Sequence, residues 1–115
     1  MTSATIDAET FAALRETTGG EFVRELVDTF LEEAPSMLDD LRQSLESQNA
    51  DRFRRAAHSL KSNSNTFGAL ALGALARDLE MAGVAQVSQH GAQSLAALEA
   101  EYARVAKALT ALRHE

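Results

Sequence analysis

Apolar residues recur every three or four positions along most of this 115-residue chain. The clearest stretch, near the C-terminus, consists of Leu95, Leu98, Tyr102, Val105, Leu109 and Leu112. Such spacing places these side chains on one face of an α-helix that packs nearly antiparallel to its neighbours. Ala and Leu are the main apolar residues, and the chain has six Gly, one Pro and no Cys. The sequence therefore predicts an all-α fold without strands.

The interruptions of this periodicity predict five helices. Asp7 is the expected N-cap of the first, Gly83 is expected to end the fourth, and Pro35 lies inside the second. The helices should span about residues 7–16, 22–47, 51–65, 70–82 and 95–112. Because the apolar phase is the same on both sides of Pro35, we expect one helix there with a kink or loosened turn. Short loops between such helices predict an up-and-down four-helix bundle with a short additional N-terminal helix, in a single domain over residues 1–115.

Composition and charge exclude several classes of function. No apolar run approaches the roughly 20 residues of a membrane-spanning helix, and residues 1–5 are too short and polar for a signal peptide, so we expect a cytoplasmic protein without membrane contact. A net charge of −6 argues against nucleic-acid binding. His90 and His114 are expected at the surface without a metal site. Each apolar stripe is needed once to build the bundle, which predicts a monomer.

Residues 52–77 contain no Asp or Glu, although the chain has 17 acidic residues, and they include one histidine, His58. At about 100° per residue, the predicted third helix places His58 on the solvent side. The side that faces the core consists of Phe53, Ala56, Ala57, Leu60, Ser64 and Phe67. His58 is therefore expected to be an exposed histidine in a cationic segment.

The helical neighbours of His58 favour a nucleophilic role. Nearby cations disfavour the imidazolium form, so we expect a neutral ring with one nitrogen free to attack an electrophile. The same cations would stabilise an anionic group on that nitrogen. Arg54 and Arg55 fit the role of ordinary solvated charges as well as they fit that of docking residues. The neighbours at three and four positions are Arg54, Arg55, Lys61 and Ser62, none of them acidic, and Asn65 lies two turns on.

This region resembles the histidine-containing phosphotransfer (HPt) domains of bacterial two-component phosphorelays. The matching features are His-x-Leu-Lys at residues 58–61, a Gly at the tenth position after the histidine, and an Ala-Pro pair at residues 34–35. They also include Leu72, Leu75 and the pair Leu79-Glu80. The resemblance extends over nearly the whole chain.

The resemblance implies roles for individual residues. His58 would be phosphorylated, Lys61 would contact the phosphoryl group, Gly68 would shape the turn after the helix, and Glu80 would approach the histidine. Ser62 stands where the family often has Gly. Its hydroxyl would either hydrogen-bond the imidazole or phosphoryl oxygens, or simply be tolerated there.

The function implied by the resemblance is phosphate relay between His58 and aspartates of receiver domains in response regulators and hybrid kinases. The receiver would supply Mg²⁺, so no cofactor of its own is expected. The sequence has no glycine-rich phosphate loop or ATP-site motifs, which predicts a phosphocarrier and not a kinase. We expect a stand-alone protein, with a domain of a hybrid kinase as another possibility. The alternative function is a bundle that binds receiver or kinase domains without carrying phosphate, motivated by Ser62.

Overall fold

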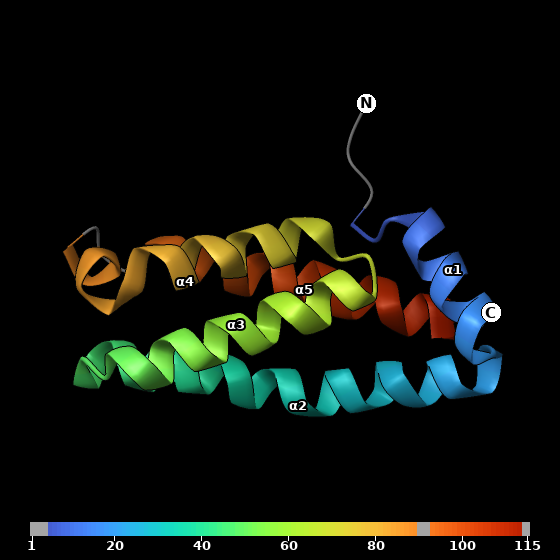
Figure 1. Ribbon diagram of the computed structural model, residues 1–115, viewed down its shortest axis with the longest axis horizontal. Helices are drawn as coiled ribbons and strands as arrows, with labels where there is room; N and C mark the ends of the chain where they lie inside the picture. Colours follow the sequence, from blue (N-terminus) through green and yellow to red (C-terminus); the bar gives the residue numbers. More distant parts are fainter. Residues whose placement is uncertain (1–4, 90–92, 114–115) are drawn as a thin grey trace.

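The computed structural model describes residues 5–89 and 93–113, and within these ranges it contains five helices and no strands. The helices are α1 (Ala8–Thr18), α2 (Gly20–Ser47), α3 (Ala50–Thr66), α4 (Leu70–Gln89) and α5 (Gln93–Arg113). Figure 1 shows α2 to α5 running lengthwise along the molecule, while α1 lies at one end, near the start of α2. The predicted all-α class and the four-helix bundle with a short N-terminal helix are confirmed.

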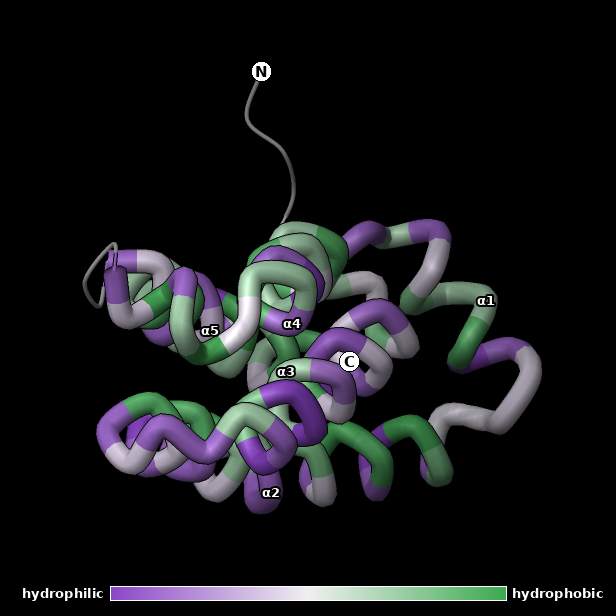
Figure 2. Tube along the Cα trace, turned by 60° about the vertical axis from the view of Figure 1, so that its left-hand side comes forward, coloured by the Kyte–Doolittle hydropathy of each residue, from purple (hydrophilic) through white to green (hydrophobic). Residues whose placement is uncertain are grey.

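Each helix buries one apolar face in a common core. Figure 2 shows hydrophobic and hydrophilic stretches alternating along the helices, as expected for amphipathic segments. On α3 the buried residues are those that the periodicity predicts to face inward. Phe67, just after α3, contributes to an aromatic cluster in which its ring centroid lies 5.3 Å from that of Phe30. Tyr102 of α5 completes the cluster at 6.1 Å from Phe30. These contacts join α2, α5 and the end of α3.

Gly68 closes the turn between α3 and α4. Its φ of 83° lies in the left-handed region, which favours glycine. Its N–H donates to the Asn65 carbonyl at 3.1 Å, and the Ala69 N–H donates to the Ser64 carbonyl at 2.8 Å, as in a Schellman C-cap. The Gly68 carbonyl accepts from the Asp7 N–H at 2.8 Å, and a Cβ on Gly68 would lie 2.9 Å from the Asp7 carbonyl oxygen. Gly68 therefore joins the start of α1 to the α3–α4 turn.

Helix α1 begins at the N-cap that the sequence predicts. The Asp7 carboxylate accepts from the Thr10 N–H at 3.0 Å and from the Thr10 hydroxyl at 2.6 Å. These hydrogen bonds hold the pKa of the Asp7 carboxyl below its usual value, the hydroxyl bond most of all. Ile6 and Phe11, on either side of the cap, are both buried in the core. The helix extends to Thr18, beyond the expected end.

The two predicted interruptions of helical structure, at Pro35 and at Gly83, affect their helices differently. Helix α2 runs through Pro35 as one helix, as predicted, and Pro35 is exposed. The Leu31 carbonyl lacks the donor that another residue at this position would supply. Gly83 has φ 78° and ψ 168°, and so breaks the helical conformation where the sequence predicts. The first helical segment of α4 therefore ends at Gly83, as predicted, and a second segment, which the sequence did not predict, follows it to Gln89. Val84 and Val87 are buried, and their packing accounts for the continuation.

Candidate functional site

Three polar side chains meet on the surface formed by α3 and α4. His58 Nδ1 lies 2.9 Å from one carboxylate oxygen of Glu80, and Lys61 Nζ lies 3.0 Å from the other. The His58 side chain is 60% exposed, whereas those of Lys61 and Glu80 are 26% and 20% exposed. One carboxylate therefore holds both the imidazole of an exposed histidine and the ammonium group of a largely buried lysine.

Helix geometry explains why these groups meet. His58 and Lys61 are three residues apart on α3 and so lie on the same side of the helix. Glu80 comes from α4, which returns beside α3 after the turn at Gly68. Leu60 and Leu79, each close to a site residue in sequence, are almost completely buried. Their burial fixes the rotation of both helices and leaves the three polar groups at the edge of the seam.

The Glu80 carboxylate determines the hydrogen-bonding role of the ring. The hydrogen bond from Lys61 is the largest cause that lowers the pKa of Glu80, and the bond with His58 lowers it further, while burial opposes both. Glu80 is consequently ionised at neutral pH and can only accept hydrogen bonds. The nitrogen that faces it, Nδ1, must carry a hydrogen. In a neutral ring this leaves the lone pair on Nε2.

A hollow of about 410 Å³ opens beside the ring. Arg54, Arg55, His58 and Ser59 line it from α3, and Glu80 lines it from α4. Its cations are only weakly held: the Arg54 guanidinium lies 3.3 Å from the Asp51 carboxylate, with both side chains largely exposed. The hollow thus presents an imidazole, two guanidinium groups and the Glu80 carboxylate to a ligand or partner from outside.

These features fit the results of comparison with known proteins. The model of the Hpt domain family matches residues 25–115. The chain belongs to the Hpt domain family. Its structure is similar to the crystal structure of histidine-containing phosphotransfer protein B (HptB) from Pseudomonas aeruginosa PAO1, with a TM-score of 0.88 and 26% sequence identity. The match covers 98% of this chain and 97% of that one. No curated protein matches the sequence.

Family membership confirms the resemblance drawn from the motif. It connects this Hpt domain with histidine phosphotransfer in two-component phosphorelays, and with receiver domains of response regulators or kinases as interaction partners. Within the described residues, no helix is long and apolar enough to cross a membrane.

The structure brings together only some of the expected site residues of this Hpt domain. His58, Lys61 and Glu80 are in contact, and Arg54 lines the adjoining hollow. Ser62 is exposed, and its hydroxyl makes no hydrogen bond to any residue in 5–89 or 93–113. Asn65 lies two turns from His58, and its side chain is directed at Gly73 of α4. Gly68 shapes the turn after α3, as the resemblance implies.

The segment without acidic residues in the sequence is not without acidic neighbours in the structure. The neighbours of His58 along α3 are indeed not acidic, but Glu80 reaches the ring from α4. The contact of Asn65 with Gly73 is also missed by sequence reasoning, because a glycine inside an apolar helix gives no signal of its neighbour. His90 and His114 lie outside the described residues.

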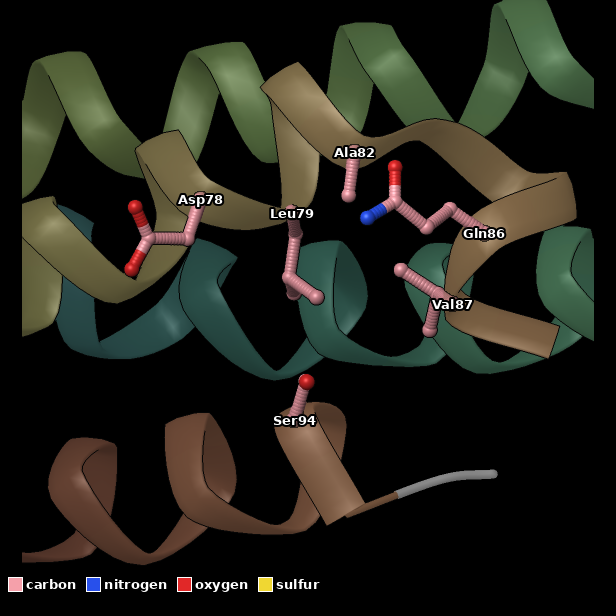
Figure 3. Close-up of a pocket in the computed structure, with 6 residues that line it drawn as sticks. All are labelled: Asp78, Leu79, Ala82, Gln86, Val87 and Ser94. Carbon is pink, nitrogen blue, oxygen red and sulfur yellow. The ribbon is translucent and has the colours of Figure 1, made fainter. Parts of the chain in front are cut away.

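A second hollow, of about 240 Å³, lies between α4 and α5 beside the Gly83 break (Figure 3). It is lined by Asp78, Leu79, Ala82, Gln86, Val87 and Ser94. Asp78 is two residues from Glu80, or about 200° around the helix, so this hollow opens on another face of α4 than the His58 site. Among the described residues that line it, Asp78 is the one ionisable side chain, and we assign no chemistry to it.

Proposed function

We propose that this Hpt domain carries a phosphoryl group on Nε2 of His58, which it accepts from the phosphoaspartate of a receiver domain and passes to another receiver. The observation that carries the proposal is the hydrogen bond between His58 Nδ1 and the Glu80 carboxylate on an exposed surface. This bond directs the lone pair of a neutral imidazole to Nε2, the nitrogen that does not face Glu80.

The transfer needs few groups from this chain. The Nε2 lone pair attacks phosphorus in line, an N–P bond forms, and the bond between phosphorus and the aspartyl oxygen breaks, which releases the receiver carboxylate. The phosphorylated ring is cationic and keeps its hydrogen on Nδ1, opposite the negative charge of Glu80. Glu80 therefore stabilises positive charge that develops as the N–P bond forms. The reverse steps return the phosphoryl group to an aspartate.

Lys61 and Arg54 supply positive charge near the transferring group. Lys61 Nζ is bound to Glu80 in the unphosphorylated protein, and its flexible side chain allows it to turn toward phosphoryl oxygens once these are present. Arg54 lines the hollow beside the ring, where its charge favours approach of the acidic pocket of a receiver. Ser62 is exposed one turn beyond the ring, and its hydroxyl is available to the same oxygens.

The partner completes the site. Mg²⁺ bound in the receiver would offset charge on the phosphoryl oxygens, and the chain itself needs no nucleotide for the transfer. The activity is therefore that of a phosphocarrier between partners.

The test is phosphate transfer from a receiver domain labelled on its aspartate. We expect His58→Gln to accept no label, because the amide has no nucleophilic ring nitrogen, and to keep its melting temperature, because the side chain is exposed. His90→Gln is the matched control, since it makes the same change at another histidine, and it should accept label like the wild type. The assignment is wrong if His58→Gln accepts label at the wild-type rate. A wild-type chain that binds receivers but accepts no label would favour the interaction module without phosphate.

A further inference from the structure

A close contact joins α3 and α4 at a distance from the histidine. A Cβ added to Gly73 would lie 2.1 Å from Asn65 Oδ1 and 2.9 Å from Asn65 Cγ, so the Asn65 side chain occupies the space of the missing Cβ. Gly73 is buried and lies within the helix, where its N–H donates to the Ala69 carbonyl at 2.9 Å. Its φ is not in the left-handed region, so the need for glycine here is one of space and not of backbone conformation.

The Asn65–Gly73 contact and the His58–Glu80 contact belong to the same alignment of α3 against α4. Asn65 follows His58 by seven residues on α3, and Gly73 precedes Glu80 by seven residues on α4. Seven residues are about two helical turns, or roughly 10.5 Å. Because the two helices are antiparallel, the pairs Asn65–Gly73 and His58–Glu80 lie two turns apart along the same seam.

We propose that Asn65 and Gly73 form a positioning pair that fixes the register of α4 against α3 and thereby sets the Glu80 carboxylate against Nδ1 of His58. Asn65 fills a notch that only glycine leaves in the surface of α4. A hydrogen bond such as that of His58 requires about 2.7–3.2 Å between its heavy atoms. A slide of α4 by the rise of one residue, about 1.5 Å, would remove the notch from Asn65 and weaken that bond.

The pair adds a restraint on sliding to those that the turn at Gly68, the buried packing and Lys61 provide. The turn at Gly68 fixes the near end of α4, and Lys61 also binds Glu80, but a long flexible ammonium side chain follows a moving carboxylate. Asn65 has a short side chain with few rotamers, so its place in the notch restricts sliding more strictly. The expected effect on phosphotransfer rests on the proposed function, whereas the expected effect on the hydrogen at Nδ1 of the His58 imidazole does not.

The experiment compares Gly73→Ala, Asn65→Ala and the double variant by nitrogen NMR of the His58 ring, at one fixed pH and without phosphate. In Gly73→Ala the new methyl group collides with Asn65, so we expect the share of the ring with hydrogen on Nδ1 to fall and phosphotransfer to slow several-fold. In the double variant the methyl group introduced at position 73 takes the space that Asn65 vacates, which should restore both. Gly20→Ala is the matched control, because a Cβ there meets nothing within 4 Å.

The outcomes separate this proposal from its competitors. If Gly73→Ala keeps the wild-type tautomer share and transfer rate, Asn65 simply swings into solvent and the pair has no positioning role. If the double variant is as impaired as Gly73→Ala, steric pairing is refuted. Should Gly73→Ala not fold, Asn65→Ala must lower the Nδ1–H share while the isosteric Asn65→Asp keeps it, and equal values overturn the proposal. A wild type that accepts no phosphate would refute the proposed function, while the tautomer comparison would still decide the role of the pair.

Discussion

On one side of α3, Phe53, Ala57 and Leu60 are completely buried, whereas on the other side His58 is 60% exposed. The buried side is held by exclusion of water and by many small contacts, which residues of similar shape and volume can replace. The exposed side depends on a few directed contacts with α4, in which Glu80 binds both His58 and Lys61. Substitutions on the first side should therefore reduce stability, and substitutions on the second should reduce activity while the fold persists.

The largest effect on stability is expected for Leu60→Ala, two residues from His58, and it tests this comparison most severely. Leu60 has no exposed surface, so its truncation leaves a cavity and should lower the free energy of unfolding by about 2–5 kcal/mol. At temperatures where the variant is still folded, it should accept phosphate at close to the wild-type rate. Urea denaturation and a transfer assay on the same sample test both expectations. A normal stability with slow transfer would show that the buried side acts directly on the site.

The next largest expected effect is the difference in stability loss between Gly68→Ala and Gly83→Ala. Both glycines have positive φ, which costs about 1 kcal/mol or more for alanine. A Cβ at Gly68 would also meet the Asp7 carbonyl oxygen at 2.9 Å, whereas one at Gly83 would meet nothing within 4 Å. Gly68→Ala should therefore lower the melting temperature more. Equal losses in thermal denaturation would mean that the docking of α1 on this turn adds no stability.

Helical periodicity predicted most of the fold because α2, α3 and α5 each have a continuous apolar face. It predicted the end of a helix at Gly83, but not the second helical segment beyond it, in which Val84 and Val87 pack into the core. That continuation depends on tertiary burial, which a local stop signal does not encode.

The site was predictable to the extent that it lies on one helix. The spacing of His58 and Lys61 places both on the exposed side of α3, and the structure agrees. The position of Glu80 depends on the register between two helices, so only the family resemblance indicated it. Asn65 was grouped with His58 because the two share a helix face, yet its side chain is committed to Gly73.

Acidification should remove the contribution of the ionised Glu80 carboxylate to the free energy of unfolding. Its carboxyl has a lowered pKa in the folded protein, mainly through the hydrogen bond from Lys61, so it stabilises the fold fully above the unfolded pKa of about 4.3. That contribution should be lost as the pH falls through the lower pKa of the folded state. The measurement is the difference in the free energy of unfolding between wild type and Glu80→Gln across this range. A difference that stays constant from neutral to acidic pH would contradict the depressed pKa.

The smallest effect on stability is expected for Lys61→Ala. This variant tests most directly whether the exposed side of α3 serves activity and not stability. Lys61 is partly exposed, and among the described residues its ammonium group pairs with Glu80, so its loss should change the free energy of unfolding by less than about 1 kcal/mol. Transfer should nevertheless slow, because the ammonium group is then absent from the transferring phosphoryl oxygens. Lys107→Ala, an exposed lysine on α5, is the matched control and should change neither quantity. If Lys61→Ala unfolds at a much lower temperature with unimpaired transfer, Lys61 holds α3 and α4 together and has no part in the chemistry.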